Sequence, residues 1–298
     1  MGLRVNPNIV PDILSGLNGL KQQLNSSDLE LASGRSINSP SDNPAGIAAL
    51  VLNHNAQNST DTFQRNIGNL QSTLQIADSA LNSAVGVINQ AISLGVQAGN
   101  STLSSGDRQA IAQQLQGIQQ QLLSIANTQS GGTYLFAGTL VETQPFTLDP
   151  ASASGVDYNG NSAVTQVEIE NGQSAGTNVP GDQLFLNPAG SLLGSIQQLI
   201  TAVQTNTGIP AASDALGQAA GEFDTQRSFY GAALNQLQST STFLASQKLQ
   251  LSSQESNISA ADVSQVVTTF SQAEVAYTAL LEAEGKVLNL PTLLNFLQ

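Results

Sequence analysis

The sequence predicts a mainly α-helical fold: a long antiparallel helical rod, coiled-coil-like and built from both chain ends, with a small β-rich inserted head domain. Apolar residues recur at spacings of three and four near both termini, which is typical of helices that pack along one seam. In the middle of the chain this spacing stops, and Gly, Asn and Pro separate short strand-like runs. The seam positions are Val10, Ile13, Leu17, Leu20, Leu24 and Leu31 near one end, and Val263, Val266, Phe270, Ala273, Tyr277, Leu280 and Val287 near the other.

The first helix is expected to run from near Asn6 or Asn8 to Ala32. Gly34 should end it in a left-handed turn, because glycine reaches that conformation without a side-chain clash. The segment RSINSPSDNPAG that follows is dense in turn-forming residues. A sharp turn is therefore expected between the first helix and the second.

The second helix is predicted to begin with Asn43 as N-cap and Pro44 at the first helical position. Apolar residues keep heptad spacing from Phe63 to Ile88, and the helix is expected to reach about Ala98. At ~1.5 Å per residue, roughly 50 residues span ~75 Å, which is longer than a compact globule allows. A third helix should follow the turn at Asn100 to Gly106 and stop before Gly131.

A small β-rich insert is expected from Thr133 to Asn187. It interrupts both helical stripes at one point, so we place it at the end of the long helices. Short apolar runs bounded by turn formers indicate the strands. The candidate strands are Tyr134–Ala137, Gly155–Tyr158, Val164–Glu170 and Leu184–Leu186.

The remaining chain returns to helix. We expect helices over Ser191 to Val203 and from about Ser213 to Glu255, the second one after Ile209-Pro210. The last helix is predicted to start at Ser259, with Asp262 three residues on, since the Ser259 hydroxyl can accept a hydrogen bond from a free backbone N–H. Pro291, which lacks a backbone donor, is its predicted stop. The predicted domains are residues 1–43 with 258–298 (terminal coiled coil), 44–131 with 190–257 (long-helix rod) and 132–189 (insert).

Composition excludes several functions. Charged residues make up 10% of the chain, against a typical ~25%. The net charge is −13 with only 8 basic residues, which argues against binding to nucleic acid or to anionic membranes. Cysteine is absent, so disulfides, thiolate nucleophiles and Cys-ligated metals are excluded.

The sequence offers no secretion or membrane signal of the usual kinds. Its start, MGLRVNPNIVPDIL, lacks the apolar core and the cleavage site of a Sec signal peptide. No apolar run approaches the ~18 residues of a membrane-spanning helix. We therefore expect a protein that stays in the cytosol or leaves by a route without a cleaved signal.

No motif points to catalysis, a cofactor or a metal. His54 is the only histidine, and its polar neighbours favour a solvated surface position. No acidic loop has calcium-site spacing, and the Gly131-Gly132 pair lacks the lysine of a phosphate loop. A carboxylate pair formed only by folding stays open, but nothing in the sequence selects one. We expect a structural protein, not an enzyme.

The segment LASGRSINSPSDNPAGIAA, from Leu31 to Ala49, resembles the signature of the flagellin family. Its Leu-x-Ser-Gly-x-x-Ile-Asn run leads into Asp-x-Pro-Ala-Gly, and the resemblance extends over roughly residues 1–130 and 190–298. It implies an extracellular axial protein of the bacterial flagellum that leaves through the flagellar type III export channel. The matching residues are Leu31, Ser33, Gly34, Arg35, Ile37, Asn38, Asp42, Pro44, Ala45 and Gly46.

Within the family, two segments are similar to the hook–filament junction subfamily. They are GTYLFAG, which ends at Gly138, and DYNGN, which begins at Asp157. Filament flagellins tend to carry arginines where Gln90 and Ile92 stand here. The resemblance implies a structural adaptor that forms a ring with copies of itself, above hook-associated protein 1 and below flagellin, with an export chaperone as a further partner. The subfamily positions are Tyr134, Leu135, Phe136, Ala137 and Gly138.

Three alternatives remain open at this point. The chain could be a minor flagellin that forms the filament, a type III translocator, for which a membrane-inserting stretch is missing, or an enzyme, which would need activity as a purified monomer. The terminal helices are short and rich in Ser, Asn and Gln, so we expect them to be loose until assembly completes their seams. Arg35 either pairs with a carboxylate of a neighbouring subunit or stays solvated.

Overall fold

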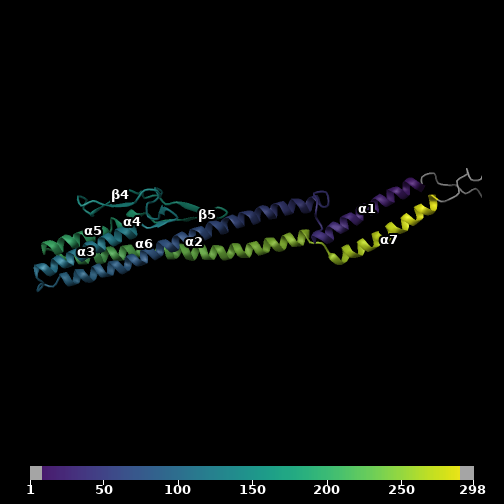
Figure 1. The fold of residues 1–298 in the computed structure, drawn as a ribbon. Helices are drawn as coiled ribbons and strands as arrows, with labels where there is room; N and C mark the ends of the chain where they lie inside the picture. The colour runs from purple at the N-terminus through teal and green to yellow at the C-terminus, as the bar shows by residue number, and fades with distance from the viewer. Residues whose placement is uncertain (1–8, 289–298) are drawn as a thin grey trace, which may run out of the picture. The chain divides into compact units, whose positions relative to one another are not determined.

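The computed structural model describes the backbone of residues 9–288 and the side chains of residues 11–286 (Figure 1). The chain divides into two compact units, one of residues 1–58 with 247–298 and one of residues 59–246. The three-part division expected above stays a prediction. The helices are α1 (Ile9–Ser33), α2 (Pro44–Ala98), α3 (Ser105–Ala126), α4 (Gly181–Phe185), α5 (Leu192–Thr205), α6 (Ile209–Ser259) and α7 (Val263–Leu288). The strands are β1 (Gln129–Ser130), β2 (Thr133–Tyr134), β3 (Phe146–Leu148), β4 (Val156–Tyr158), β5 (Gln166–Glu170) and β6 (Gln173–Gly176).

The predicted fold class is confirmed: long helices pack antiparallel, and a small β-rich region is inserted between them. In the unit of residues 59–246, Arg227 Nε of α6 lies 3.2 Å from Asp78 Oδ1 of α2. Further along α2, a Cβ atom added to Gly95 would lie 2.9 Å from Ser213 Oγ of α6. The residue numbers rise in α2 as they fall in α6, so the two helices run in opposite directions.

Several predicted helix ends are confirmed by their caps. Asn43 Oδ1 accepts a hydrogen bond from Gly46 N at 2.9 Å at the start of α2, and Gly34 has a φ of 68° after α1. The α6 helix begins at Ile209, earlier than the predicted start near Ser213. The reason is Pro210: it fits the first helical turn, where a backbone N–H has no partner to lose.

The start predicted for the last helix is wrong. Ser259 is the final residue of α6, where its Oγ donates to Glu255 O at 2.8 Å. Asp262 caps α7 instead, since its Oδ1 accepts from Ser264 N at 3.0 Å and from Gln265 N at 3.2 Å. Both residues are good N-cap types, and the sequence pattern did not separate them. The predicted stop at Pro291 lies outside the described residues.

The insert contains three two-stranded antiparallel sheets among the described residues, β1-β2, β3-β4 and β5-β6. The strand predicted at Leu184–Leu186 is wrong, because most of that run forms the short helix α4. Short apolar runs of this kind do not separate strand from helix by periodicity. Of Tyr134–Ala137 only the first residue is in a strand, and β1, β3 and β6 were not predicted.

The insert shares its core with the helices. The ring centroid of Phe185 in α4 lies 5.5 Å from that of Phe223 in α6, and Val179 N donates to Tyr230 Oη at 3.3 Å. At β5, Glu168 O accepts from Asn66 Nδ2 of α2 at 2.9 Å, well before α2 ends. The sequence had suggested that the insert lies at the end of the long helices. In the structure it also packs along the sides of α2 and α6 (Figure 1).

Candidate assembly surface

The terminal helices α1 and α7 pack against each other within the unit of residues 1–58 and 247–298 (Figure 1). A Cβ atom added to Gly16 of α1 would lie 3.3 Å from Leu280 Cδ1 of α7, so the two backbones approach closely there. Of the predicted seam residues whose side chains are described, Leu17, Val266 and Ala273 are buried. Those left half-buried are Ile13, Leu20, Leu24, Leu31, Phe270, Tyr277 and Leu280.

One predicted seam position is exposed, and two others are not described. Val263 has 56% of its surface exposed. The side chains of Val10 and Val287 lie outside the described residues. Apolar side chains are also exposed on positions outside the predicted seam, namely Leu14, Leu29, Val267, Val275 and Leu281. The α1/α7 pair thus carries apolar surface both between its helices and away from them.

The flagellin-like motif forms a tight turn between α1 and α2. Asp42 Oδ2 accepts from Asn38 N at 2.9 Å and from Ser39 N at 2.6 Å. These two backbone hydrogen bonds, that from Asn38 first, lower the pKa of Asp42 below its usual value. Ile37 is buried, and a Cβ atom on Gly46 would lie 2.6 Å from its Cδ1. Gly46 is therefore required by packing.

The other motif residues support the same turn. Asn38 Nδ2 donates to Arg35 O at 2.7 Å, and Ser33 Oγ accepts from Arg35 N at 3.1 Å. Pro44 and Ala45 are exposed in the first turn of α2. Most of the motif is thus explained by how it shapes the turn.

This turn is joined to the α6–α7 connection by backbone hydrogen bonds. Ser36 N donates to Ser259 O at 2.7 Å, and Ala261 N donates to Gly34 O at 3.0 Å. They form an isolated antiparallel bridge between Arg35 and Ala260. The α1–α2 turn and the α6–α7 connection are therefore hydrogen-bonded to each other, and we call this place the crossing.

Side chains strengthen this connection around Glu255. Its Oε1 accepts from Arg35 at 2.7 Å and lies 3.0 Å from His54 Nε2, while its Oε2 accepts from Gln57 Nε2 at 3.0 Å. The His54 hydrogen bond, followed by that of Gln57, lowers the pKa of Glu255. We call these four residues the Glu255 clasp. Arg35 thus pairs within its own chain while its side chain stays 44% exposed, and its pairing with a neighbour's carboxylate stays a prediction. His54 is exposed as expected but is bound to Glu255.

The subfamily motif is a packing element of the insert. Leu135, Phe136, Ala137 and Gly138 are buried, and Tyr134 is half-buried. A Cβ atom on Gly138, whose φ is 70°, would lie 2.1 Å from Asn161 O. Only glycine fits at this approach.

The second subfamily segment, DYNGN, meets the first at this place. Asn161 N donates to Ala137 O at 3.2 Å, and Asn161 Oδ1 accepts from Thr139 N at 2.9 Å. Tyr158 Oη donates to Phe136 O at 3.0 Å. Burial, followed by the charge of Asp182, raises the pKa of Tyr158 to about 12. The two segments were noticed separately in the sequence, and the structure brings them together.

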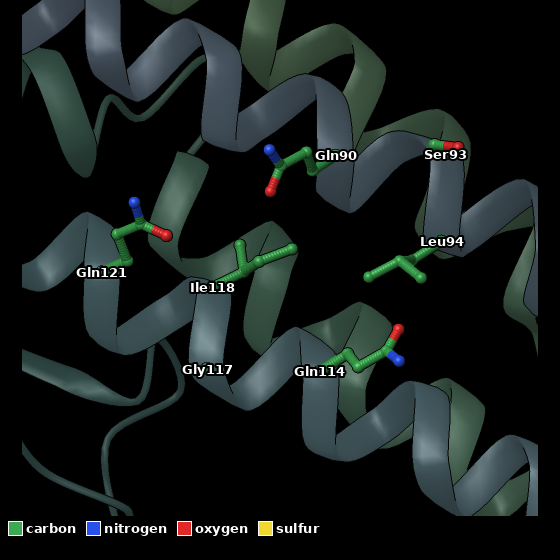
Figure 2. A pocket seen from close by; sticks show the side chains of 7 residues that line it. All are labelled: Gln90, Ser93, Leu94, Gln114, Gly117, Ile118 and Gln121. Carbon is green, nitrogen blue, oxygen red and sulfur yellow. The ribbon is translucent and has the colours of Figure 1, made fainter.

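An open groove lies between α2 and α3 (Figure 2). Leu94 and Ile118 form its apolar floor, and the side chains of Gln90, Gln114 and Gln121 surround it. Its lining contains amides, a hydroxyl and apolar groups but no charged side chain. The lining has no acid or base that could activate the Ser93 hydroxyl for catalysis.

Two further properties concern the described residues only. None of their His, Asp and Glu side chains gather into a group that could hold a metal ion. Within the same part of the chain, no helix combines the length and the hydropathy that crossing a membrane requires.

The sequence matches two regions of one protein family. The bacterial flagellin N-terminal helical region matches residues 9–140, and the bacterial flagellin C-terminal helical region matches residues 213–290. Together they cover both helical parts and leave most of the insert unmatched. No curated protein matches the chain.

Solved structures of flagellar proteins share the fold. A flagellar hook-associated protein from Vibrio parahaemolyticus is 21% identical with a TM-score of 0.66, covering 74% of this chain and 100% of its own. Hook-associated protein-3 from Legionella pneumophila is 18% identical with a TM-score of 0.64, and the match covers 70% of this chain and 98% of that protein. FlgL of Bacillus cereus is 21% identical with a TM-score of 0.59, and the match covers 69% of this chain and 99% of that protein.

These findings agree with the terminal helix pair, the motif turn and the inserted sheets described above. The chain has a structural role in the flagellum and is not an enzyme. It belongs to the bacterial flagellin family.

Proposed function

We propose that this protein is the structural adaptor that joins the flagellar hook to the flagellin filament. It forms a ring of its own copies, with hook-associated protein 1 below and flagellin above. It is secreted through the flagellar type III channel and resides in the extracellular flagellum. The solved structures that share its fold include proteins named as hook-associated, which supports this assignment.

The observation that carries the assembly role is the incomplete burial of the α1/α7 pair. Among its described seam residues Leu17, Val266 and Ala273 are buried, whereas Phe270, Tyr277 and Leu280 are only half-buried. Outside the seam, Val275 is 68% exposed. Fully burying a Val, Leu or Phe side chain stabilises by roughly 1.5–3 kcal/mol. Neighbouring subunits that cover these residues would complete a helical packing that one chain leaves unfinished.

The insert favours the junction over the filament. Its core is built where the GTYLFAG and DYNGN segments meet, at Phe136, Gly138 and Asn161. Gln90 and Ile92, which stand where filament flagellins tend to carry arginines, point the same way. The alternative, a filament subunit, rests on the same α1/α7 surface, which a long tube of copies could also bury.

Export fits the same proposal. The chain has no cysteine, so no disulfide opposes threading through a narrow channel in an unfolded state. Its half-buried terminal helices order fully only when neighbours cover them. An export chaperone that covers these helices before secretion is part of the proposal.

Copy number and position test the proposal. An epitope tag placed in the exposed loop at Glu142 and detected by immunogold should label one narrow band between hook and filament. Label distributed along the whole filament would support the filament subunit instead. An untagged strain controls for the antibody, and a motility assay of the tagged strain checks that the tag is tolerated.

A further inference from the structure

The chain contains three Asn-Gly pairs, Asn18-Gly19, Asn159-Gly160 and Asn171-Gly172. In such a pair the glycine nitrogen can attack the asparagine side-chain carbonyl, because no Cβ on the next residue hinders the ring that forms. The reaction needs a mobile backbone and removal of the glycine amide proton. The surroundings of the three pairs differ in both respects.

Asn171-Gly172 connects β5 to β6 and is exposed. Gly172 has a φ of 73°, and no atom lies within 4 Å of the position its Cβ would occupy. No neighbouring atom therefore crowds the glycine of this pair, and the asparagine is exposed. Connections of this kind on a protein surface are also more mobile than the elements they join.

The Gly172 amide proton that must be removed is hydrogen-bonded to a carboxylate. Glu168 Oε1 accepts the hydrogen bond of Gly172 N at 3.2 Å. The N–H bond of Gly172 lies in the peptide plane. Attack on the asparagine carbonyl instead uses the nitrogen electrons perpendicular to that plane. The carboxylate can thus accept the proton without blocking the attack.

We propose that Asn171 is a self-modification site at which Glu168 serves as the base. The Gly172 nitrogen forms a bond to Asn171 Cγ and gives its proton to Glu168. The bond from Cγ to Nδ2 breaks, and the nitrogen leaves as ammonia after Glu168 returns the proton. Water then opens the succinimide and leaves either aspartate or isoaspartate at position 171.

Of the other two pairs, Asn159-Gly160 is held in place. Asn18-Gly19 lies inside α1, which the proposed function expects to be fully ordered only after assembly, so it does not serve as the comparison for the free protein. Asn159 is fixed by its N–H, which donates to Pro145 O at 2.7 Å, and by its Nδ2, which donates to Thr147 Oγ1 at 3.2 Å. A Cβ on Gly160 would lie 2.5 Å from the Tyr158 ring, so this turn is crowded as well.

Modification changes both charge and geometry of the hairpin. A new carboxylate appears at position 171, next to Glu170 in the chain and in the same hairpin as Glu168, and like charges repel. Isoaspartate adds one carbon to the main chain of a two-residue connection, so the pairing of Glu170 with Gln173 cannot be kept. The hairpin of an aged chain is therefore weaker than that of a new one.

The test incubates the purified full-length protein at neutral pH, folded and in denaturant, and follows each site by fragmentation mass spectrometry. Fragmentation is needed because Asn159 and Asn171 share one tryptic peptide, since no Lys or Arg lies between Arg108 and Arg227. In the folded protein we expect Asn171 to convert at least about tenfold faster than Asn159. In denaturant the rates should become equal. Equal rates in the folded protein, or the same ratio after unfolding, would overturn the proposal.

Two matched variants test the base. Glu168→Gln should slow conversion of Asn171 severalfold, less than the roughly 100-fold of a well-matched catalytic base, because a carboxylate is a weak base at neutral pH. Glu170→Gln removes the same charge next to the turn but no bond to Gly172, so it should leave the rate unchanged. A rate unaffected by Glu168→Gln, or lowered equally by both variants, contradicts the role of Glu168.

Discussion

Replacing Glu255 by Gln tests the clasp that ties the motif turn to the end of α6. The carboxylate is bound by Arg35, His54 and Gln57 at distances of 2.7 to 3.0 Å. Glutamine keeps one acceptor oxygen, but its NH2 group faces donors and the charge is lost. The substitution should therefore loosen the crossing without changing the packing of α2 and α6.

The expected magnitude follows from the exposure of the partners. The side chains of Arg35 and Glu255 are 44% and 23% exposed, respectively, so this ion pair contributes only ~0.2–1 kcal/mol. Each further hydrogen bond adds roughly 0.5–1.5 kcal/mol. Because glutamine retains one acceptor, the variant should lose about 1–2 kcal/mol of local stability. The contact between the motif turn and the α6–α7 connection should then open roughly 5- to 30-fold more often.

Hydrogen exchange measures this opening directly. The amides of Ser36 and Ala261 donate across the crossing to Ser259 O and Gly34 O, so their exchange reports it. The control, Asp78→Asn, removes the Arg227 ion pair of the other unit and should leave these two amides unchanged. If Glu255→Gln does not accelerate exchange at either amide, the clasp does not hold the crossing.

The pH dependence has a definite sign. Because hydrogen bonding lowers the pKa of Glu255 in the folded protein, its contribution is fully present above the unfolded carboxyl pKa of ~4.3. It is lost as the pH falls through the lower folded value. The difference in exchange between wild type and Glu255→Gln should therefore be present above about pH 4.3 and disappear as the pH falls well below it. A difference that persists in strong acid contradicts the assignment.

Three further substitutions test other parts of the chain. Phe270→Asp places a carboxylate in the half-buried α1/α7 seam, which is costly, so the chain should be secreted but absent from isolated flagella; normal incorporation argues against assembly through this seam. Pro44→Ala should hardly affect motility, whereas deleting residues 39–43 removes the Asp42 hydrogen bonds and the Asn43 cap and should abolish it; a motile deletion strain would sink the role of the turn. Phe185→Ala, at a side chain with 0% exposure, should lower the free energy of unfolding by about 3–5 kcal/mol, and an unchanged denaturant midpoint would refute that packing.

The helical part of the fold could be predicted because its signals are local. Heptad spacing, Gly34 after α1 and the Asn43-Pro44 start of α2 each act within a few residues, and each is found in the structure. The insert was harder because its short strands pair over few residues. The Leu184–Leu186 run became helix because nothing in so short a segment sets its periodicity.

The contacts between distant segments were not accessible from the sequence. Glu255 lies within a polar run and carries no motif, so only folding reveals that it binds Arg35 and His54. The meeting of Phe136 with Asn161 depends in the same way on how the insert folds. The outward apolar surface at Val275 was missed because a single seam had been assumed for each terminal helix.

The junction assignment is tested most directly by deleting the gene and examining both cells and medium. The account predicts cells with bare hooks and flagellin monomer shed into the medium, with filaments restored when the intact gene is returned. A complementing gene that encodes Phe270→Asp should fail to restore them, although its product is secreted. If cells without this protein still grow full-length filaments on their hooks, the junction assignment is wrong.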